Sequence, residues 1–336
     1  MTLSSKCLCS LNLRPCKVSP GMTDSILGFC ATEYNSSSRL RCFHIQEAFL
    51  HQSHGSATLS DNFYRAFEDR FRGSRQEIID RLKIYLPFVT PLIDIYEDTS
   101  AVDLGCGRGE WLEILNDAGV KARGVDLDQG MLDACIERGL DVKLADALTT
   151  LRSLPDESQV VVSGFHIIEH VSFAEWKDWI NEAFRVLKPA GLVIFETPNP
   201  ENLFVATRSF YLDPTHLNPI PPELLSFAVE FAGFSNVKIL RLQEDKELAN
   251  SSKISLTNIV KSASPDYSVI GQKPATMDLT EKFSSAFDIE YGLSLEMLLN
   301  KWDYQFEQLV VQANQPKTQQ NWMHRLGNIK KQIWNP

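Results

Sequence analysis

The sequence lacks the features of three classes of protein. It has no run of about 18 to 20 apolar residues, so it does not predict a helix that spans a membrane. It has no basic excess, since 33 Lys and Arg stand against 43 Asp and Glu, and the formal net charge is −10. Such a chain cannot broadly neutralise phosphates, so we expect no nucleic-acid partner. The opening residues also lack the apolar segment of a secretory signal, and we expect a cytoplasmic protein.

Cysteine is scarce beyond the first 42 residues. Only Cys106 and Cys135 lie further on, both inside apolar segments, and the other five are Cys7, Cys9, Cys16, Cys30 and Cys42. Residues 1–58 contain the Ser-rich "NSSS" and "HQSHGS" and show no helical or strand periodicity. We therefore expect them to be disordered or a mis-assigned N-terminal extension, with a targeting peptide as one alternative. A metal site at "CLC" is another alternative, although no partner follows at a zinc-finger spacing.

Helical patterns begin near residue 59. Aromatic side chains recur at i, i+4 and i+8, the spacing of one helix face, at Phe63, Phe67 and Phe71. The stretch "SRQE", Ser74 to Glu77, has the pattern of a capping box that begins a second helix, and Pro87 is expected to end this helix. Residues 59–98 are therefore predicted to form a helical lid.

From residue 99 short apolar runs alternate with helical stretches. This alternation predicts an α/β fold, a Rossmann-like, seven-stranded, mostly parallel sheet with helices on both faces. The predicted strands are 101–106, 122–128, 142–146, 160–166, 191–198, 236–242 and 267–274. The last two are separated by a long polar loop, so we expect them to close the sheet as an antiparallel hairpin. The sheet domain is predicted over 99–275, with a helical C-terminal arm over 276–336.

The stretch "VDLGCGRGEW", residues 102–111, predicts a tight turn that brings backbone close to a ligand. Asp103 ends the first strand, a helix begins near Gly109, and the turn between them contains Gly105, Cys106 and Gly107. The free amides of that helix start are expected to face the crevice. A dinucleotide fingerprint, G-x-G-x-x-G, needs a third small residue where Glu110 stands, and an acid there repels a pyrophosphate. An NAD-dependent enzyme is therefore disfavoured but stays an alternative.

Five segments, in this order and at these separations, resemble the class I S-adenosylmethionine-dependent methyltransferases: "VDLGCGRGEW", "GVDLD", "LADAL", "GFHIIEHV" and "RVLKPAGLVIFETPNP". The resemblance covers about residues 99–274 and implies S-adenosylmethionine as the cofactor. More narrowly, "FYRAFEDRFRGSR", "ETPNPENL" and "FYLDPTHLNPIPP" are similar to segments of bacterial methyltransferases that are encoded with surface-polysaccharide and O-antigen machinery.

The resemblance places acids around the cofactor. Asp126 ends the second strand and is expected to accept from both ribose hydroxyls. Asp146 is implied to contact the adenine amino group and Asp103 the ammonium end. An acid at a strand end also caps helices, an alternative that stays open for Asp146, and Asp128 is the expected cap of its helix. The remaining expected cofactor contacts are Gly105, Cys106, Gly107, Leu127, Ala147, His166 and, from the lid, Tyr64, Arg65 and Arg72.

Two alternatives remain for the lid arginines. Either Arg65 and Arg72 form exposed i, i+4 and i, i−4 ion pairs with Asp69 and Glu68, or one of them holds the methionine carboxylate while the other faces the acceptor.

The reacting centre is expected after the fourth strand, in "GFHIIEHV". His166, Glu169 and His170 are spaced i, i+3 and i+4, which resembles a pair of metal ligands. The H-E-x-x-H order and a third ligand are missing from the sequence pattern, so we predict no metal. His166 is expected to face the methyl group or the methionine carboxylate. His216, in "YLDPTHLNPIPP", is the second candidate for a catalytic base, and a purely structural role is the alternative for it and for His170.

The chain lacks one further motif that narrows the substrate. No Asn/Asp-Pro-Pro-aromatic tetrad, which related enzymes use to hold a nucleobase amine, follows the fourth strand. This leaves hydroxyl, carboxyl or carbon acceptors, and we expect in-line methyl transfer to a hydroxyl of a glycan or small metabolite. A catalytically degenerate scaffold that acts through the helical arm is the alternative. The arm carries a helical apolar stripe that is expected to pack on its own domain, or else on a partner chain or a second copy: Leu295, Leu298, Leu299, Trp302, Phe306 and Leu309.

Overall fold

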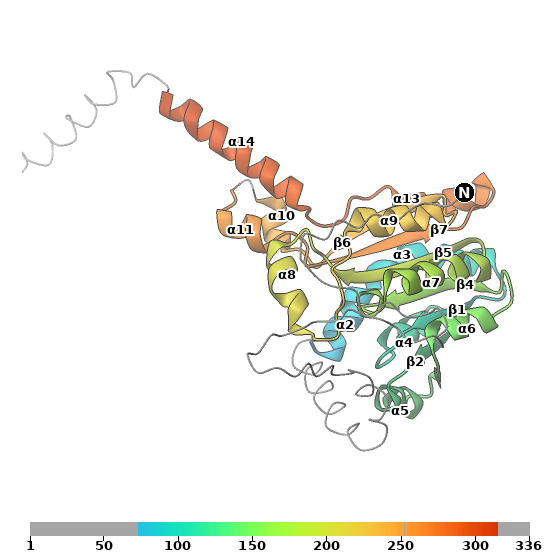
Figure 1. Cartoon of the computed structure of the whole chain (residues 1–336). Helices are drawn as coiled ribbons and strands as arrows, with labels where there is room; N and C mark the ends of the chain where they lie inside the picture. Colours follow the sequence, from blue (N-terminus) through green and yellow to red (C-terminus); the bar gives the residue numbers. More distant parts are fainter. Residues whose placement is uncertain (1–72, 252, 315–336) are drawn as a thin grey trace, which may run out of the picture. The chain divides into compact units, whose positions relative to one another are not determined.

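A twisted seven-stranded sheet with the strand order β3-β2-β1-β4-β5-β7-β6 organises the protein (Figure 1). The computed structural model describes residues 73–251 and 253–314. The strands are β1 Ser100–Leu104, β2 Lys121–Asp126, β3 Asp141–Leu144, β4 Gln159–Phe165, β5 Leu187–Pro198, β6 Asn236–Leu242 and β7 Asp266–Gln272.

The sheet is parallel except at one strand. β1 pairs with β2 and with β4, β2 with β3, and β4 with β5, all in parallel. β7 runs antiparallel to both of its neighbours, β5 and β6. The predicted Rossmann-like fold and its antiparallel closure are therefore confirmed, and the predicted strands lie within a few residues of the observed ones.

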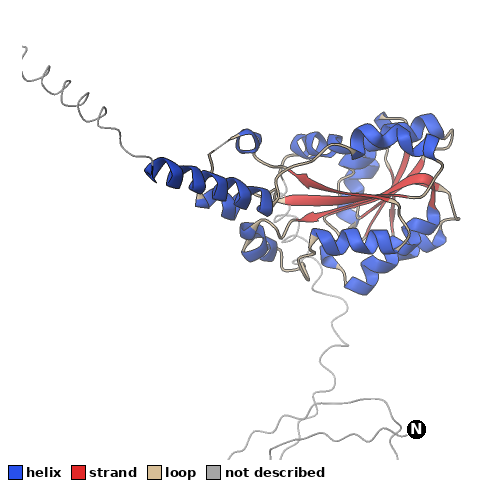
Figure 2. Ribbon diagram, turned by 90° about the horizontal axis from the view of Figure 1, so that it is seen from above, coloured by secondary structure: helices blue, strands red, loops and turns tan. Residues whose placement is uncertain are grey.

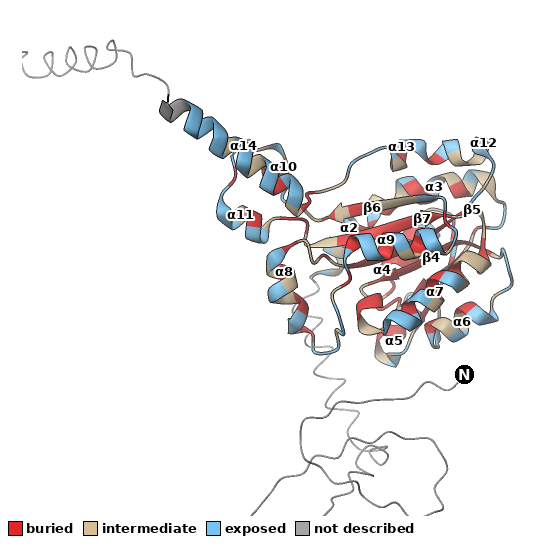
Figure 3. Ribbon diagram, turned by 45° about the horizontal axis from the view of Figure 1, so that its top comes forward, coloured by how far each residue is buried: buried red, intermediate tan, exposed pale blue. Residues whose placement is uncertain are grey.

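Helices cover both faces of the sheet, as Figure 2 shows. One face packs on α2 Arg75–Leu82, α3 Leu86–Ile95, α4 Glu110–Asp117, α5 Gln129–Glu137 and α13 Ser284–Phe287. The other face packs on α6 Ala147–Ser153, α7 Phe173–Val186 and α9 Pro222–Phe231. Each helix buries one apolar stripe, so the central strands are buried and the helices are buried on one side only (Figure 3).

Two local predictions need correction. Pro87 does not end the second helix: α2 ends at Leu82, and Pro87 stands in the first turn of α3, where its missing N–H costs no hydrogen bond. The segment between β6 and β7 is not a polar loop. It contains α10 Lys246–Asn250 and α11 Leu256–Lys261, each with an N-cap side chain that accepts backbone N–H groups.

The topology decides where a ligand can bind. Strand order reverses at β1, which lies between β2 and β4. Loops that leave the carboxyl ends of these strands run in opposite directions there and open a crevice. Trp179 of α7 and Met131 of α5 reach this crevice from opposite faces of the sheet.

The C-terminal arm is helical, as predicted, over α14 Leu295–Asn314. Leu298 is fully buried, and its cluster joins the start of α14 to α10 and α11, with Leu295 and Trp302 packed beside it. Phe306 and Leu309 remain 58% and 56% exposed. The first turns of α14 therefore pack on the rest of the described chain, as predicted, and the later turns do not. Contact of the later turns with a partner chain or a second copy stays a prediction. Among the helices of residues 73–314, none is both long and apolar enough to cross a membrane.

Two neighbouring leucines test how the arm is attached. We expect Leu298→Ala to lower the free energy of unfolding by about 2–5 kcal/mol, because it leaves a cavity in a buried cluster. Leu299→Ala, at a position that is 42% exposed, should change it by less than about 0.5 kcal/mol. Urea unfolding together with hydrogen exchange in α11 measures both effects. Equal effects of the two substitutions would show that the arm is not docked through Leu298.

Candidate functional site

The turn after β1 is joined directly to the end of β2. The amides of Gly105 and Cys106 both donate to the carbonyl oxygen of Val125, at 2.8 and 3.0 Å. Gly105 has φ +67°, and a Cβ there would lie 2.3 Å from the Cδ1 atom of Ile167 in the loop after β4. Glycine is therefore required both by the left-handed backbone and by the close approach of that loop.

The next amide of the turn positions Asp126. Gly107 N–H donates to Oδ2 of Asp126 at 2.9 Å, and the amide of Asp128 donates to Oδ1 at 2.8 Å. These two bonds hold the carboxylate at the mouth of the crevice, where it stays partly exposed. An acceptor oxygen that has one backbone donor keeps a second lone pair for a ligand.

A cavity of about 350 Å³ opens beside this carboxylate. Its walls come from the loops after β1, β2, β3 and β4, and neither Lys nor Arg is among the described residues that line it. Carboxylates at Asp126 and Asp146 stand on one side, and apolar groups complete the wall, among them Leu127, Met131, Ala147 and Trp179. The cavity therefore combines acceptors with a flat apolar surface, without the cations that a phosphate group requires.

Two of the acids act as helix caps. Asp128 accepts from the amides of Gly130 and Met131 at the start of α5, as predicted. Asp146 accepts from Thr149 N–H at 2.8 Å at the start of α6, so the capping alternative describes its hydrogen bond. Asp146 nevertheless lines the cavity as well, and its capping role leaves lone pairs available.

A second, smaller cavity of about 70 Å³ contains Asp103 and Cys106. Asp103 is 2% exposed and accepts from Ser163 Oγ at 2.7 Å, and Trp111 Nε1 donates to the same hydroxyl at 3.1 Å. Three residues line both cavities and so lie at their junction: Gly105, Phe165 and His166.

Arg81 also lines the smaller cavity, from the last turn of α2. The sequence analysis did not single it out, because Glu77 one turn earlier gives it an ordinary i, i+4 partner. Only the structure shows that its basic side chain shares a cavity with the acids Asp103 and Glu110, which marks Arg81 as a candidate binding residue. The expected lid residues Tyr64, Arg65 and Arg72, and the segment 1–58, lie outside the described residues.

His166 has a left-handed backbone with φ +53°, held by its N–H donating to Glu196 O at 2.8 Å. This conformation turns its ring into a group of three carboxylates. Nδ1 lies 3.3 Å from Glu169 Oε1, and Nε2 lies 3.4 Å from Glu196 Oε1 and 4.0 Å from Asp266 Oδ1.

The carboxylates determine the charge of this imidazole. Burial by itself lowers the pKa of His166, but the close carboxylates of Glu169 and Glu196 and the charge of Asp266 outweigh it, so the pKa stands well above its ordinary value. Burial raises the pKa of Asp266 to about 6. At neutral pH His166 is therefore a cation with both ring nitrogens protonated, able to donate hydrogen bonds but not to accept a proton.

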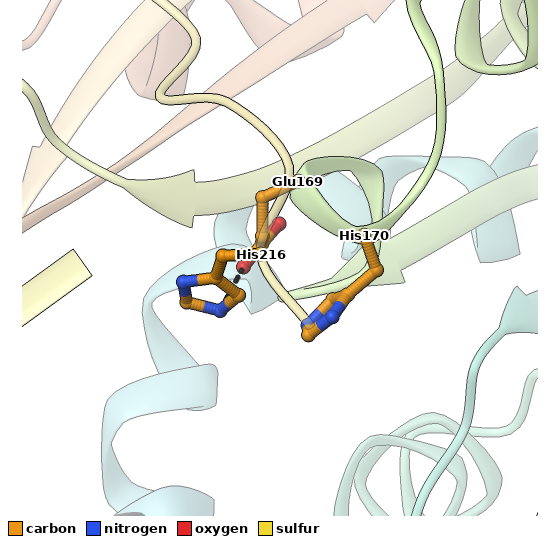
Figure 4. A group of neighbouring side chains, drawn as sticks. All are labelled: Glu169, His170 and His216. Carbon is orange, nitrogen blue, oxygen red and sulfur yellow. Dashed lines mark ion pairs between the residues drawn. The ribbon is translucent and has the colours of Figure 1, made fainter. Parts of the chain in front are cut away.

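Glu169, His170 and His216 form a second cluster, drawn in Figure 4. Glu169 is 1% exposed and accepts from Thr197 Oγ1 through Oε2 at 2.9 Å. His170 lines the larger cavity, and burial lowers its pKa below the ordinary value. His216 lines neither cavity, but the loop before α9 brings its ring to 4.7 Å from that of His170. The sequence analysis named His216 as a candidate base, but its spacing did not place it beside Glu169 and His170.

Comparison with known proteins identifies the fold with a family of enzymes. A family model described as a methyltransferase domain matches residues 102–195, from β1 into β5. The crystal structure of an S-adenosylmethionine-dependent methyltransferase from Archaeoglobus fulgidus is 33% identical, with a TM-score of 0.56, and the match covers 63% of this chain and all of that one.

Two curated relatives match over shorter stretches. A probable S-adenosylmethionine-dependent methyltransferase of Mycolicibacterium smegmatis is 30% identical over 133 residues, 40% of this chain and 51% of the relative. A ubiquinone biosynthesis O-methyltransferase of Methylococcus capsulatus is 37% identical over 107 residues, 30% of this chain and 43% of the relative. The chain thus spans about half the length of the curated relatives it matches.

The charge of His166 is open to direct measurement. We expect Glu196→Gln to lower the pKa of His166 by about one unit or more, because it removes one of the acceptors that favour the imidazolium. NMR titration of the labelled ring measures the shift. The matched control is Glu201→Gln, whose carboxylate pairs with Arg241 at 2.6 Å instead. An unchanged His166 pKa in the first variant would contradict the assignment of charge.

Proposed function

The chain belongs to the S-adenosylmethionine-dependent methyltransferases, and we propose that it methylates a hydroxyl group of a glycan or small metabolite. The observation that carries the proposal is the carboxylate of Asp126, held by the glycine turn at the rim of a cavity that no lysine or arginine of the described residues lines. A cofactor with a ribose diol and no phosphate fits such a cavity.

The larger cavity fits the nucleoside end of the cofactor. Asp126 would accept from the ribose hydroxyls, because its oxygens keep lone pairs beyond their bonds to Gly107 and Asp128. Leu127 and Ala147 would flank the adenine, and Asp146 would accept from its amino group. When bound, the cofactor supplies an electrophilic methyl group on a positively charged sulfur.

The smaller cavity fits the amino-acid end. Asp103 would pair with the ammonium group, since its carboxylate is buried and oriented by Ser163. The carboxylate of the same moiety needs a cation, and His166 and Arg81 line the cavity with Asp103. This proposal keeps His166 as a binding residue and makes it a donor rather than a base, because its pKa is raised. Arg81 takes a role that the sequence analysis assigned to Arg65 or Arg72.

The acceptor is proposed to enter where the two histidine-bearing loops meet. His170 faces the larger cavity, and the segment before α9 contributes exposed apolar side chains beside His216, with Tyr211 61% and Leu217 52% exposed. These side chains suit a ring-shaped acceptor. The name of the relative from Methylococcus capsulatus supports oxygen as the acceptor atom, and the resemblance of "ETPNPENL" and "FYLDPTHLNPIPP" to enzymes of surface-polysaccharide clusters supports a glycan.

Substitution of Asp126 tests the cofactor site. We expect Asp126→Ala to weaken S-adenosylhomocysteine binding about 10- to 150-fold without unfolding the domain, because hydrogen bonds to a charged acceptor contribute about 1.5–3 kcal/mol. Isothermal calorimetry measures the Kd. Asp141→Ala is the matched control, since this exposed acid of β3 pairs with Arg123 and does not line the cavity. An unchanged Kd in a folded Asp126 variant would refute the ribose assignment.

The reaction itself is tested with labelled cofactor. We expect mass spectrometry to detect one added methyl group, on oxygen, after incubation with hydroxylated glycans, glycolipids or small metabolites, and far less with Asp126→Ala. Methylation of nitrogen in matched amine acceptors would refute the choice of acceptor. Absence of S-adenosylhomocysteine binding at millimolar ligand would support the degenerate scaffold instead.

A further inference from the structure

We propose that Glu169, His170 and His216 bind a divalent transition-metal ion. One ligand atom from each of the three lies within 4.8 Å of the other two (Figure 4). Two imidazoles and one carboxylate form a ligand set that binds Zn²⁺ and other first-row divalent ions. Both loops that carry these residues are held by the core: Glu169 and His170 follow β4, and His216 precedes α9.

The spacing of the ligand atoms suits one shared ion. His216 Nε2 lies 3.9 Å from Glu169 Oε1, which is too far for a hydrogen bond. Metal–ligand bonds of about 2.0–2.2 Å place two ligands of one ion about 3 to 4 Å apart. The separation therefore fits an ion between the two atoms better than it fits direct contact.

Hydrogen bonds fix His216 in the tautomer that a metal needs. Its Nδ1 lies 2.7 Å from the carbonyl oxygen of Phe210, an acceptor, so Nδ1 carries the proton and donates. In the neutral ring, Nε2, the nitrogen on the side of Glu169, then keeps its lone pair. Ligand histidines are oriented in this way in most metal sites.

His170 is fixed by a chain of two hydrogen bonds. The hydroxyl of Thr215 donates its only proton to Asp213 Oδ1 at 2.6 Å. The hydroxyl oxygen of Thr215 lies 2.8 Å from Nδ1 of His170. Because its proton is already donated to Asp213, this oxygen can only accept from His170, so Nδ1 carries the proton. Nε2 of His170 is left with its lone pair. In both imidazoles the Nδ1 hydrogen bond thus directs Nε2 toward the cluster as the nitrogen that would bind a metal.

Glu169 supplies the independent sign of a missing partner. Its carboxylate is buried, and Oε2 is held by Thr197. Oε1 has no hydrogen-bond partner among residues 73–251 and 253–314, although His166 Nδ1 stands at 3.3 Å and His216 Nε2 at 3.9 Å. A buried carboxylate oxygen without a hydrogen bond is costly, and an ion would satisfy it.

The other cluster of three potential ligands is unsuitable. His166, Glu196 and Asp266 also lie within 4.8 Å of one another. However, both carboxylates of this cluster already accept hydrogen bonds from described residues. Glu196 already accepts from the Tyr85 hydroxyl, and Asp266 accepts from Gln243 Nε2 at 2.7 Å.

The position of the site indicates its purpose, and this step rests on the proposed function. His170 lines the cavity assigned to the cofactor, and three protein ligands leave a coordination position open. An acceptor hydroxyl bound there would lose its proton more readily, because a divalent ion lowers the pKa of a bound oxygen. The proton of the hydroxyl would pass to solvent water, and the oxygen would attack the methyl group while it is held by the ion.

Metal binding is tested on the full chain, stripped with chelator, without cofactor or acceptor. The probe is Mn²⁺, followed by electron paramagnetic resonance, because this ion prefers nitrogen and oxygen ligands to the cysteines of residues 1–58. We expect the wild-type chain to bind one Mn²⁺ ion at this site. In His216→Ala and in His170→Ala the affinity for this ion should fall at least about 100-fold. Thr215→Val, which removes the acceptor for His170 and the donor to Asp213 but no proposed ligand, should weaken binding about 10- to 100-fold while thermal stability is kept.

Glu201→Gln is the matched control, since its carboxylate pairs with Arg241 and belongs to neither cluster, so it should leave Mn²⁺ binding unchanged. Equal Mn²⁺ binding by wild type, His216→Ala and Thr215→Val would overturn the site, and so would loss of binding in Glu201→Gln. Because neither cofactor nor acceptor is present, this failure would leave the proposed methyl transfer standing. Methyl transfer that is unaffected by chelator, in a chain that does bind Mn²⁺, would overturn the role of the ion in the reaction.

Discussion

The binding of the glycine turn to the end of β2 is the contact on which the site depends. Three successive amides, from Gly105 to Gly107, donate to the backbone of Val125 and to the carboxylate of Asp126. The turn therefore cannot move without moving Asp126. The side chain of Ile167, in the loop after β4, packs against Gly105. This contact fixes the position of the loop that carries His166 and His170. One short segment thus sets the mutual placement of three loops and of both cavities.

His166 connects this turn to the far half of the sheet. Its amide bonds to β5, and its ring lies among carboxylates from η2 Ile168–His170, β5 and β7. Contact with His166 outweighs the effect of burial on Glu169 and lowers its pKa, and it offsets part of the burial that raises the pKa of Asp266. The left-handed backbone of His166 is the local cost of this arrangement, and such conformations are concentrated at functional sites.

The two histidine clusters differ in charge for reasons of hydrogen bonding. His166 meets carboxylates on both ring nitrogens and is protonated. His170 and His216 each meet an uncharged acceptor on Nδ1, which directs Nε2 toward Glu169 or the cavity. Histidine therefore serves as a cation at position 166 and as a potential metal ligand at positions 170 and 216. Oε1 of Glu169 lies between the two clusters, 3.3 Å from His166 Nδ1 and 3.9 Å from His216 Nε2.

The sequence by itself determined the strands and the mostly parallel sheet with its antiparallel closure, because these follow from local patterns of apolar periodicity and turn residues. It was not sufficient where contacts join distant segments. The positions of Arg81, Glu196 and Asp266 near His166 depend on how α2, β5 and β7 are arranged, and His216 reaches Glu169 only because the loop before α9 folds back onto it. Charge and tautomer were decided there too, since a pKa depends on neighbours in space and not on spacing along the chain.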